Sequence, residues 1–209
     1  MKKRNSNLIY FILLSALLFP PFLGGNIYAQ EAKKIPSIEA FDKLNTIPDT
    51  YLIDVRTRAE YQYIGHPYKA YLFPYMVFTG KLAKVDEKWE YQLSHKNKNF
   101  VKEISKVFKK TDNLLIISRD GTRSALAAKD LISEGFKKVS DIEYGFEGPE
   151  FPTDKDKNLH KFYRQLGKRN KIFSYLHRRH YGWQWWGLPW TYEIDPKYIY
   201  PADLKAPEK

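Results

Sequence analysis

Short apolar runs alternate with amphipathic stretches through much of this 209-residue chain. The runs that have the length of buried strands lie at 51–55, 70–73, 114–117 and 139–142. Between them, apolar residues recur every three or four positions, which predicts helices from a Ser37 cap onward, at 58–63, at 97–109 and from 125 to the stop at Gly135. Residues 75–96 are aromatic without a regular period, and we expect them to be irregular.

The order of these patterns indicates a fold class. The run 114–117, Leu-Leu-Ile-Ile, is apolar at every position, as a strand covered on both faces must be. Strands that alternate with helices at this spacing form parallel sheets. We therefore predict an α/β fold over residues 30–150, with a parallel sheet flanked by helices on both faces.

The pattern changes after Pro152. Apolar residues keep helical spacing through a basic stretch, and 182–190 (Gly-Trp-Gln-Trp-Trp-Gly-Leu-Pro-Trp) holds four of the five tryptophans. This predicts a C-terminal helical and aromatic extension, 151–209, that packs on the domain. Its tryptophans either bury their rings against the sheet or form an exposed surface for glycan, lipid head groups or protein.

Residues 1–29 have the layout of a secretory signal. Lys2, Lys3 and Arg4 precede an apolar stretch at 8–19, which a double proline ends. This stretch is shorter than the roughly 20 residues that span a bilayer. We expect cleavage after Ala29, a periplasmic or secreted protein, and no transmembrane span in the mature chain. An uncleaved anchor is the alternative.

Composition narrows the possible chemistry. The chain has no cysteine, which excludes disulfides, thiolate catalysis, an enzyme-bound persulfide and Cys-ligated metals. The formal net charge is +11, and 160–180 is basic without an acid. In an exported protein this favours an acidic protein partner or envelope components over nucleic acid, although such a stretch can also be a solvated helix face. His177 and His180 have no third ligand in view, so we predict no metal and no cofactor.

The stretch that follows the run 114–117 has the chemistry of an anion-binding loop. It consists of Ser118, Arg119, Asp120, Gly121, Thr122 and Arg123. It leads from a buried strand into a helix, whose first amides lack partners within the helix and attract negative charge. Gly121 lets the backbone wrap inward, and the two arginines add positive charge. A small oxyanion or an acidic protein is therefore the predicted partner.

Three blocks together resemble the rhodanese-like domain family. They are 52–56 (Leu-Ile-Asp-Val-Arg) with Glu60-Tyr61, then Gly65-His66 leading to Ala70, and the loop that opens a helix. The family's active loop reads Cys-x-x-Gly-x-Arg, and Ser118 stands where its nucleophilic cysteine belongs. The chain also departs from the family's Gly-His-Ile-Pro-Gly-Ala turn, which here reads Gly-His-Pro-Tyr-Lys-Ala. The tail with Gly-Leu-Pro-Trp resembles an exported bacterial subgroup.

The serine decides the expected function. The resemblance implies a sulfurtransferase fold, but a hydroxyl cannot hold a persulfide and needs a neighbouring base to attack a substrate. We therefore expect a non-catalytic module that binds an oxyanion or a partner through the loop. The residues expected to support the loop structurally are Asp54, Arg56, Glu60 and His66.

Other interpretations stay open. Arg123 could brace the carbonyls of its own loop, and Arg119 could be a solvated charge. The protein could be an enzyme that uses Ser118 as a nucleophile or transfers sulfur without an enzyme-bound persulfide. It could also be an envelope interaction protein that acts through its basic, tryptophan-rich tail.

Overall fold

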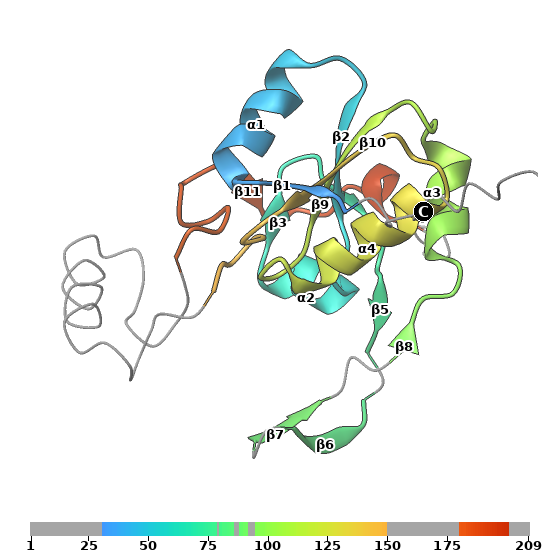
Figure 1. Cartoon of the computed structure of the whole chain (residues 1–209). Helices are drawn as coiled ribbons and strands as arrows, with labels where there is room; N and C mark the ends of the chain where they lie inside the picture. The colour runs from blue at the N-terminus through green and yellow to red at the C-terminus, as the bar shows by residue number, and fades with distance from the viewer. Residues whose placement is uncertain (1–30, 79, 86–87, 92–94, 150–179, 201–209) are drawn as a thin grey trace, which may run out of the picture.

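The computed structural model describes residues 31–78, 80–85, 88–91, 95–149 and 180–200 (Figure 1). The predicted signal segment at 1–29 and the basic stretch that follows Pro152 lie outside the described residues. Within the ranges that are described, no helix is both long and apolar enough to cross a membrane.

A five-stranded sheet in which every neighbouring pair is parallel forms the centre of the fold. Its strands, in spatial order, are β1 (Lys33–Ile35), β10 (Lys138–Ile142), β9 (Asn113–Ile117), β2 (Thr50–Asp54) and β4 (Tyr71–Leu72). Strands β2 and β9 pair with Asp54 opposite Ile117, so their carboxyl ends meet at one edge. The apolar runs predict all of these strands except β1, where Ile35 is the one buried residue.

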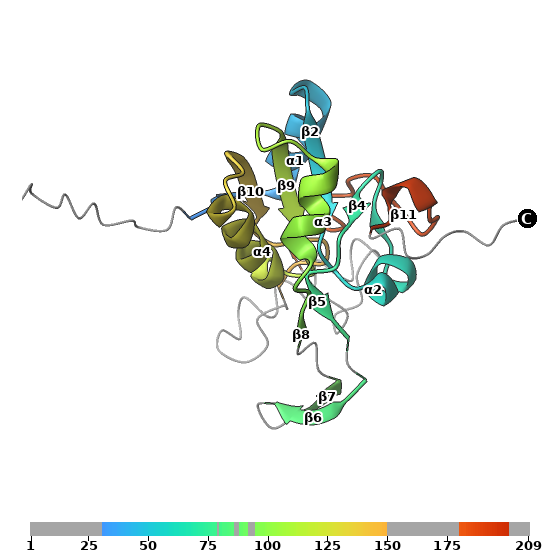
Figure 2. The same ribbon diagram turned by 90° about the vertical axis from the view of Figure 1, so that its right-hand side faces the viewer.

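Helices cover both faces of the sheet, which confirms the predicted fold class (Figure 2). Helices α3 (Phe100–Val107) and α4 (Thr122–Ser133) lie on one face, and α1 (Ser37–Thr46) lies on the other. Successive side chains of β9 point to opposite faces of the sheet, as they do along any strand. Leu114 and Ile116 pack under α3 and α4, whereas the next residue after each packs under α1.

Two helices begin or end differently from the sequence prediction. Ser37 does not cap α1: Pro36 takes the N-cap position in an extended conformation, and Ser37 is the first helical residue. The φ of Pro36 is −70°, which a helix would also accept, but its ψ of 157° is extended, so the helix starts at the next residue. Helix α3 is shorter than the predicted 97–109. It starts later because Asn97 forms a local turn by accepting the amide of Asn99, and it ends where Phe108 becomes extended.

Residues 75–96 contain more regular structure than we predicted. Strands β5 (Met76–Val77) and β8 (His95–Lys96) pair antiparallel, and beyond them β6 (Leu82–Val85) pairs antiparallel with β7 (Lys88–Tyr91). This hairpin arm projects away from the central sheet (Figure 1). Its exposed large side chains include Phe78, Leu82, Trp89 and Tyr91. The ladders are too short to leave a clear alternation in the sequence.

The described part of the C-terminal segment, 180–200, lies along the domain. Strand β11 (Trp190–Thr191) pairs antiparallel with β3 (His66–Pro67), and after the 3₁₀ turn η1 (Pro196–Tyr198), Ile199 bridges to Leu72. The tryptophans divide between the two alternatives that the sequence left open. Trp183 is 1% exposed and packs in the core under α1, whereas Trp186 is 44% exposed.

Candidate functional site

The predicted loop connects the carboxyl end of β9 to the start of α4 (Figure 1). Gly121 is the N-cap of α4 and has φ 96°, in the left-handed region. A side chain there would also collide with the carbonyl of Glu143, so the position admits only glycine. The chain after β10 packs on the loop backbone, where the Phe146 amide donates to the Ser118 carbonyl at 2.8 Å. The loop is therefore held in one shape by the backbone around it.

The Ser118 side chain is turned into the protein. The residue is fully buried, and its hydroxyl accepts the Gly121 amide at 3.1 Å. The same hydroxyl lies 3.1 Å from that of Ser124, which donates to the Gly121 carbonyl at 3.0 Å. Within the described residues, no histidine or carboxylate hydrogen-bonds to this hydroxyl. A serine nucleophile needs such a base, so the arrangement stabilises the loop and does not activate Ser118.

Arg123 is held by a carboxylate from another part of the chain. Glu60 lies in α2 (Arg58–Tyr63), which begins with a capping box between Glu60 and Thr57. Its carboxylate accepts two hydrogen bonds from the Arg123 guanidinium, one of them at 2.8 Å. Burial raises the pKa of Glu60, but Arg123 and Thr57 outweigh burial and lower this pKa to about 2. Arg123 therefore pairs with α2 and does not brace the carbonyls of its own loop.

The other charged residues of the loop are also paired. The Arg119 guanidinium lies 3.6 Å from the carboxylate of Glu147, a buried residue. Asp120 accepts the amide of Thr122 at 3.1 Å and its hydroxyl at 2.7 Å. Burial acts to raise the pKa of Asp120, yet these bonds from Thr122 keep it below its usual value. Arg119 and Arg123 thus each face a carboxylate. The Thr122 amide at the start of α4 is already bonded to the Asp120 carboxylate.

Two amides at the start of α4 remain available. The backbone N–H groups of Arg123 and Ser124 donate to no acceptor in the part of the chain that the structure describes. They belong to the first turn of a 12-residue helix, where the helix dipole favours negative charge. Together with the N–H groups of Arg119 and Asp120, which also donate to no acceptor among the described residues, these amides are the groups that a small oxyanion could use.

Asp54 and Arg56 form a buried ion pair beneath the loop edge of the sheet. Both residues are fully buried, and the Arg56 guanidinium donates to the Asp54 carboxylate at 2.6 Å and to the Gly65 carbonyl at 2.8 Å. The guanidinium also lies 4.2 Å from the ring centre of Phe146. The pair therefore connects the end of β2 to Gly65, just before β3, and to Phe146 in the segment after β10 that packs on the loop.

His66 is occupied by its own turn. Its Nδ1 lies 3.0 Å from the carbonyl of Tyr61, and the two rings stack with their centres 3.5 Å apart. Burial lowers the pKa of His66, with only partial compensation from the Tyr61 carbonyl. The backbone of Glu193, in the C-terminal segment, also contributes to the environment of the ring, and among the described residues no hydrogen bond joins His66 to the Ser118 hydroxyl.

The sequence analysis missed the buried partners of the loop, which are Ser124, Asp141 and Glu147. Burial raises the pKa of Asp141, and the neighbouring Ser124 and Lys34 oppose this only in part. Ser124 directly follows the motif and could have been included, but nothing in the sequence ties the two carboxylates to the loop. Within the described residues, no three His, Asp or Glu side chains gather as a metal site. His177 lies outside these residues.

The comparisons with known proteins agree with this geometry. The family model described as "Rhodanese-like domain" matches residues 37–150. Rhodanese-like domain-containing protein 15, chloroplastic, of Arabidopsis thaliana is 34% identical over 125 residues, which cover 58% of this chain and 61% of the relative. Thiosulfate sulfurtransferase 18 of the same plant is 30% identical over 96 residues, which cover 45% of this chain and 62% of the relative.

A solved structure shares the fold. The crystal structure of Rv0390 from M. tuberculosis matches with a TM-score of 0.55 and 21% sequence identity, over 78% of this chain and all of that one. The first curated relatives are matched over about three fifths of their own length. The similarity therefore concerns the domain and the loop that it carries.

Proposed function

This chain belongs to the rhodanese-like family, and we propose that it is a non-catalytic member that acts by binding. The observation that carries the proposal is the state of Ser118, which is buried and hydrogen-bonded to Gly121 and Ser124. Family members named as thiosulfate sulfurtransferases are among its relatives. This chain has no cysteine anywhere that could carry sulfur as a persulfide.

Within this proposal, the loop takes a small oxyanion through backbone amides. Arg119 and Arg123 already face carboxylates, so their charge is largely balanced. The N–H groups of Arg123 and Ser124 at the start of α4 are among the remaining donors, and the helix dipole adds to their attraction for an anion. An ion such as sulfate or thiosulfate has several acceptor oxygens and can accept from both of these amides at once.

A sulfurtransferase assay tests the non-catalytic part. Purified protein should show no thiosulfate:cyanide turnover, and Ser118→Ala should behave identically. Turnover by the natural sequence that Ser118→Ala abolishes would refute the proposal. Ser118→Cys restores a thiol at the end of β9, beside the α4 amides that lower a thiol pKa. We expect this variant to gain measurable turnover because the loop around it is intact.

Thermal unfolding with added anions tests the binding part. A ligand at 100 times its dissociation constant adds about 2.7 kcal/mol to the free energy of unfolding. Thiosulfate, sulfate, selenite and phosphate should each raise the melting temperature more than chloride at equal ionic strength. No specific shift with any of them would remove the oxyanion from the proposal and leave an acidic protein as the partner of the loop.

A second candidate function is an exported protein that contacts envelope components. It is favoured by the exposed large side chains of the C-terminal segment, which are Tyr181, Trp186, Trp190, Tyr192 and Ile194. We propose export with cleavage after Ala29, which N-terminal sequencing of protein from a periplasmic or secreted fraction tests. Cosedimentation with anionic vesicles should be weaker for Trp186→Ala than for the parent. Equal sedimentation, or a protein retained whole in the cytoplasm, would refute this candidate.

A further inference from the structure

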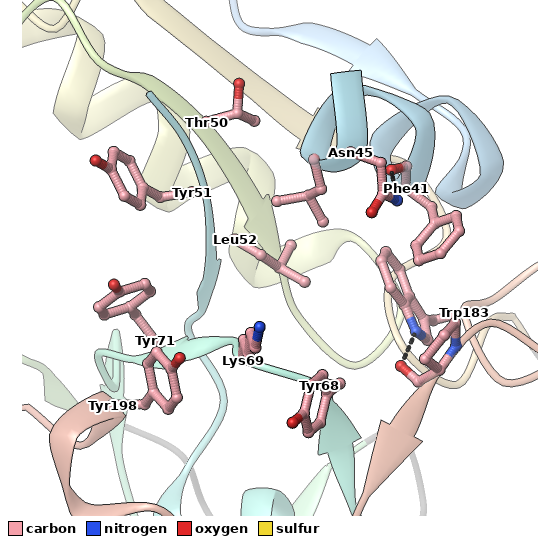
Figure 3. Close-up of a pocket in the computed structure, with 12 residues that line it drawn as sticks. Phe41, Asn45, Thr50, Tyr51, Leu52, Tyr68, Lys69, Tyr71, Trp183 and Tyr198 are labelled. Carbon is pink, nitrogen blue, oxygen red and sulfur yellow. Dashed lines mark hydrogen bonds between the residues drawn. The ribbon is translucent and has the colours of Figure 1, made fainter. Parts of the chain in front are cut away.

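A cavity of about 490 Å³ lies beside the first half of β2, away from the loop, and its lining comes from both faces of the sheet (Figure 3). This volume lies within the roughly 300–1,000 Å³ that is usual for small-molecule sites. None of its lining residues belongs to the loop or to the start of α4. They come from α1, β2, β4, the turn after β3 and the C-terminal segment.

The walls of the cavity are mainly aromatic. Phe41 and Trp183 meet edge to face at one end, with ring centres 6.0 Å apart. At the other end, Tyr71 and Tyr198 meet in the same way at 4.9 Å, and Leu52 forms an apolar surface between the two ends (Figure 3). Trp183 is fixed by a hydrogen bond from its indole N–H to the Pro189 carbonyl at 3.0 Å. The cavity thus offers rigid ring faces and edges to an apolar molecule.

One cation faces this apolar space. Lys69 is an exposed residue of the turn after β3, and its side chain lines the cavity (Figure 3). Its ammonium lies 5.4 Å from the centre of the ring of Tyr68, which is also exposed. Within the described residues it has no carboxylate partner, whereas Lys43 and Lys197 each have one. An exposed ammonium with no carboxylate within ion-pair distance can pair with an anionic ligand that enters from solvent.

The backbone of Lys69 is also strained. Its φ of 61° lies in the left-handed region, where a residue with a Cβ carries a conformational cost that glycine escapes. A lysine kept at a position that glycine would fill without strain indicates that the side chain has a use. The strain and the missing carboxylate are independent observations, and both concern the side chain that lines the cavity.

We propose that this cavity binds an apolar, preferably aromatic, molecule that carries a single negative charge. The ring or chain of the ligand would lie between the Phe41–Trp183 pair and the Tyr71–Tyr198 pair. Its carboxylate or sulfonate would pair with the Lys69 ammonium. This site goes beyond the proposed function, because it shares no residue with the loop and needs neither Ser118 nor the α4 amides.

Competition binding tests the proposal on the whole protein. The reporter is the fluorescence of 1-anilinonaphthalene-8-sulfonate, and the competitors are indole-3-acetate and its uncharged analogue tryptophol. An ion pair with an exposed lysine corresponds to about twofold to fivefold in affinity. Indole-3-acetate should therefore displace the reporter at about one half to one fifth of the tryptophol concentration. Equal displacement by both compounds would overturn the proposal.

Variants of Lys69 locate the effect. Lys69→Met keeps the apolar stem and should abolish the preference for indole-3-acetate, whereas Lys69→Arg should keep it. Lys69→Gly should abolish the preference and leave the melting temperature unchanged or higher, since the strain is removed. Lys106→Met, which removes a lysine that pairs with Glu103 on α3, is the matched control and should change nothing. A preference that survives in Lys69→Met would overturn the proposal, as would its loss in Lys106→Met. Ser118→Cys should not alter this binding, which separates it from tests of the loop.

Discussion

Replacing Glu60 with glutamine removes the carboxylate that faces Arg123 across the start of α4. The side chains of the pair are only 16% and 11% exposed, so water replaces the lost interaction poorly. The glutamine keeps the size of the side chain and one acceptor oxygen, and it therefore isolates the contribution of the charge. Arg123 would remain buried with a positive charge and no counter-ion beside it.

The magnitude follows from the pKa of Glu60. In the folded protein this pKa is lowered from 4.5 to about 2. Each pKa unit corresponds to 1.36 kcal/mol, so the ionised form stabilises the fold by about 3 kcal/mol. Because the folded pKa lies below the unfolded one, this stabilisation is complete only above about pH 5. It is lost progressively as the pH falls from about 5 towards 2.

Urea unfolding at several pH values, followed by tryptophan fluorescence, measures this effect. At pH 7 we expect Glu60→Gln to lower the free energy of unfolding by about 3 kcal/mol. The difference between parent and variant should shrink as the pH falls and nearly vanish close to pH 2. Glu39→Gln removes an exposed carboxylate that pairs with Lys33 and should change little at any pH. A difference for Glu60→Gln that stays constant between pH 7 and pH 3 would refute the reasoning.

Two further substitutions test the backbone and the tail. Gly121→Ala should lower the free energy of unfolding by more than the roughly 1–2 kcal/mol of a left-handed residue, because the new Cβ also collides with the Glu143 carbonyl. Gly135 has the same φ of 96° but open space around it, so Gly135→Ala should cost only the backbone amount. Equal melting temperatures for the two variants would contradict this. Trp183→Ala should lower the free energy of unfolding by about 3–5 kcal/mol in denaturant titrations, whereas Trp186→Ala, which removes a 44% exposed ring, should have a much smaller effect.

The sheet was predictable where strands are buried on both sides. In β9 every residue after Asn113 is buried, so the strand appears in the sequence as an uninterrupted apolar run. Strand β1 has two exposed lysines before Ile35, and at the edge of the sheet its apolar signal is a single residue. The hairpin arm escaped prediction for a related reason. Its ladders form away from the core, so burial does not impose a period on them.

The position of the loop was predictable because its residues are contiguous. The ion pairs and hydrogen bonds of its side chains were not. The motif identifies Ser118 and Arg123, yet the Glu60 that pairs with Arg123 lies 63 positions away. That pairing depends on where α2 sits relative to α4, which no local pattern specifies. The burial of the Ser118 hydroxyl likewise depends on Ser124 and on the segment after β10. Sequence patterns therefore locate the site, and tertiary packing determines its chemistry.

The order of the strands has a consequence for chain integrity. A protease that nicked the hairpin arm between β6 and β7 would divide the chain into an N-terminal fragment with β1, β2 and β4 and a C-terminal fragment with β9 and β10. In the sheet, the two strands of the second fragment are inserted between those of the first, with one shared border at β1–β10 and another at β2–β9. The halves would stay interlocked after cleavage, and this arm is where the protein could be split for fragment complementation.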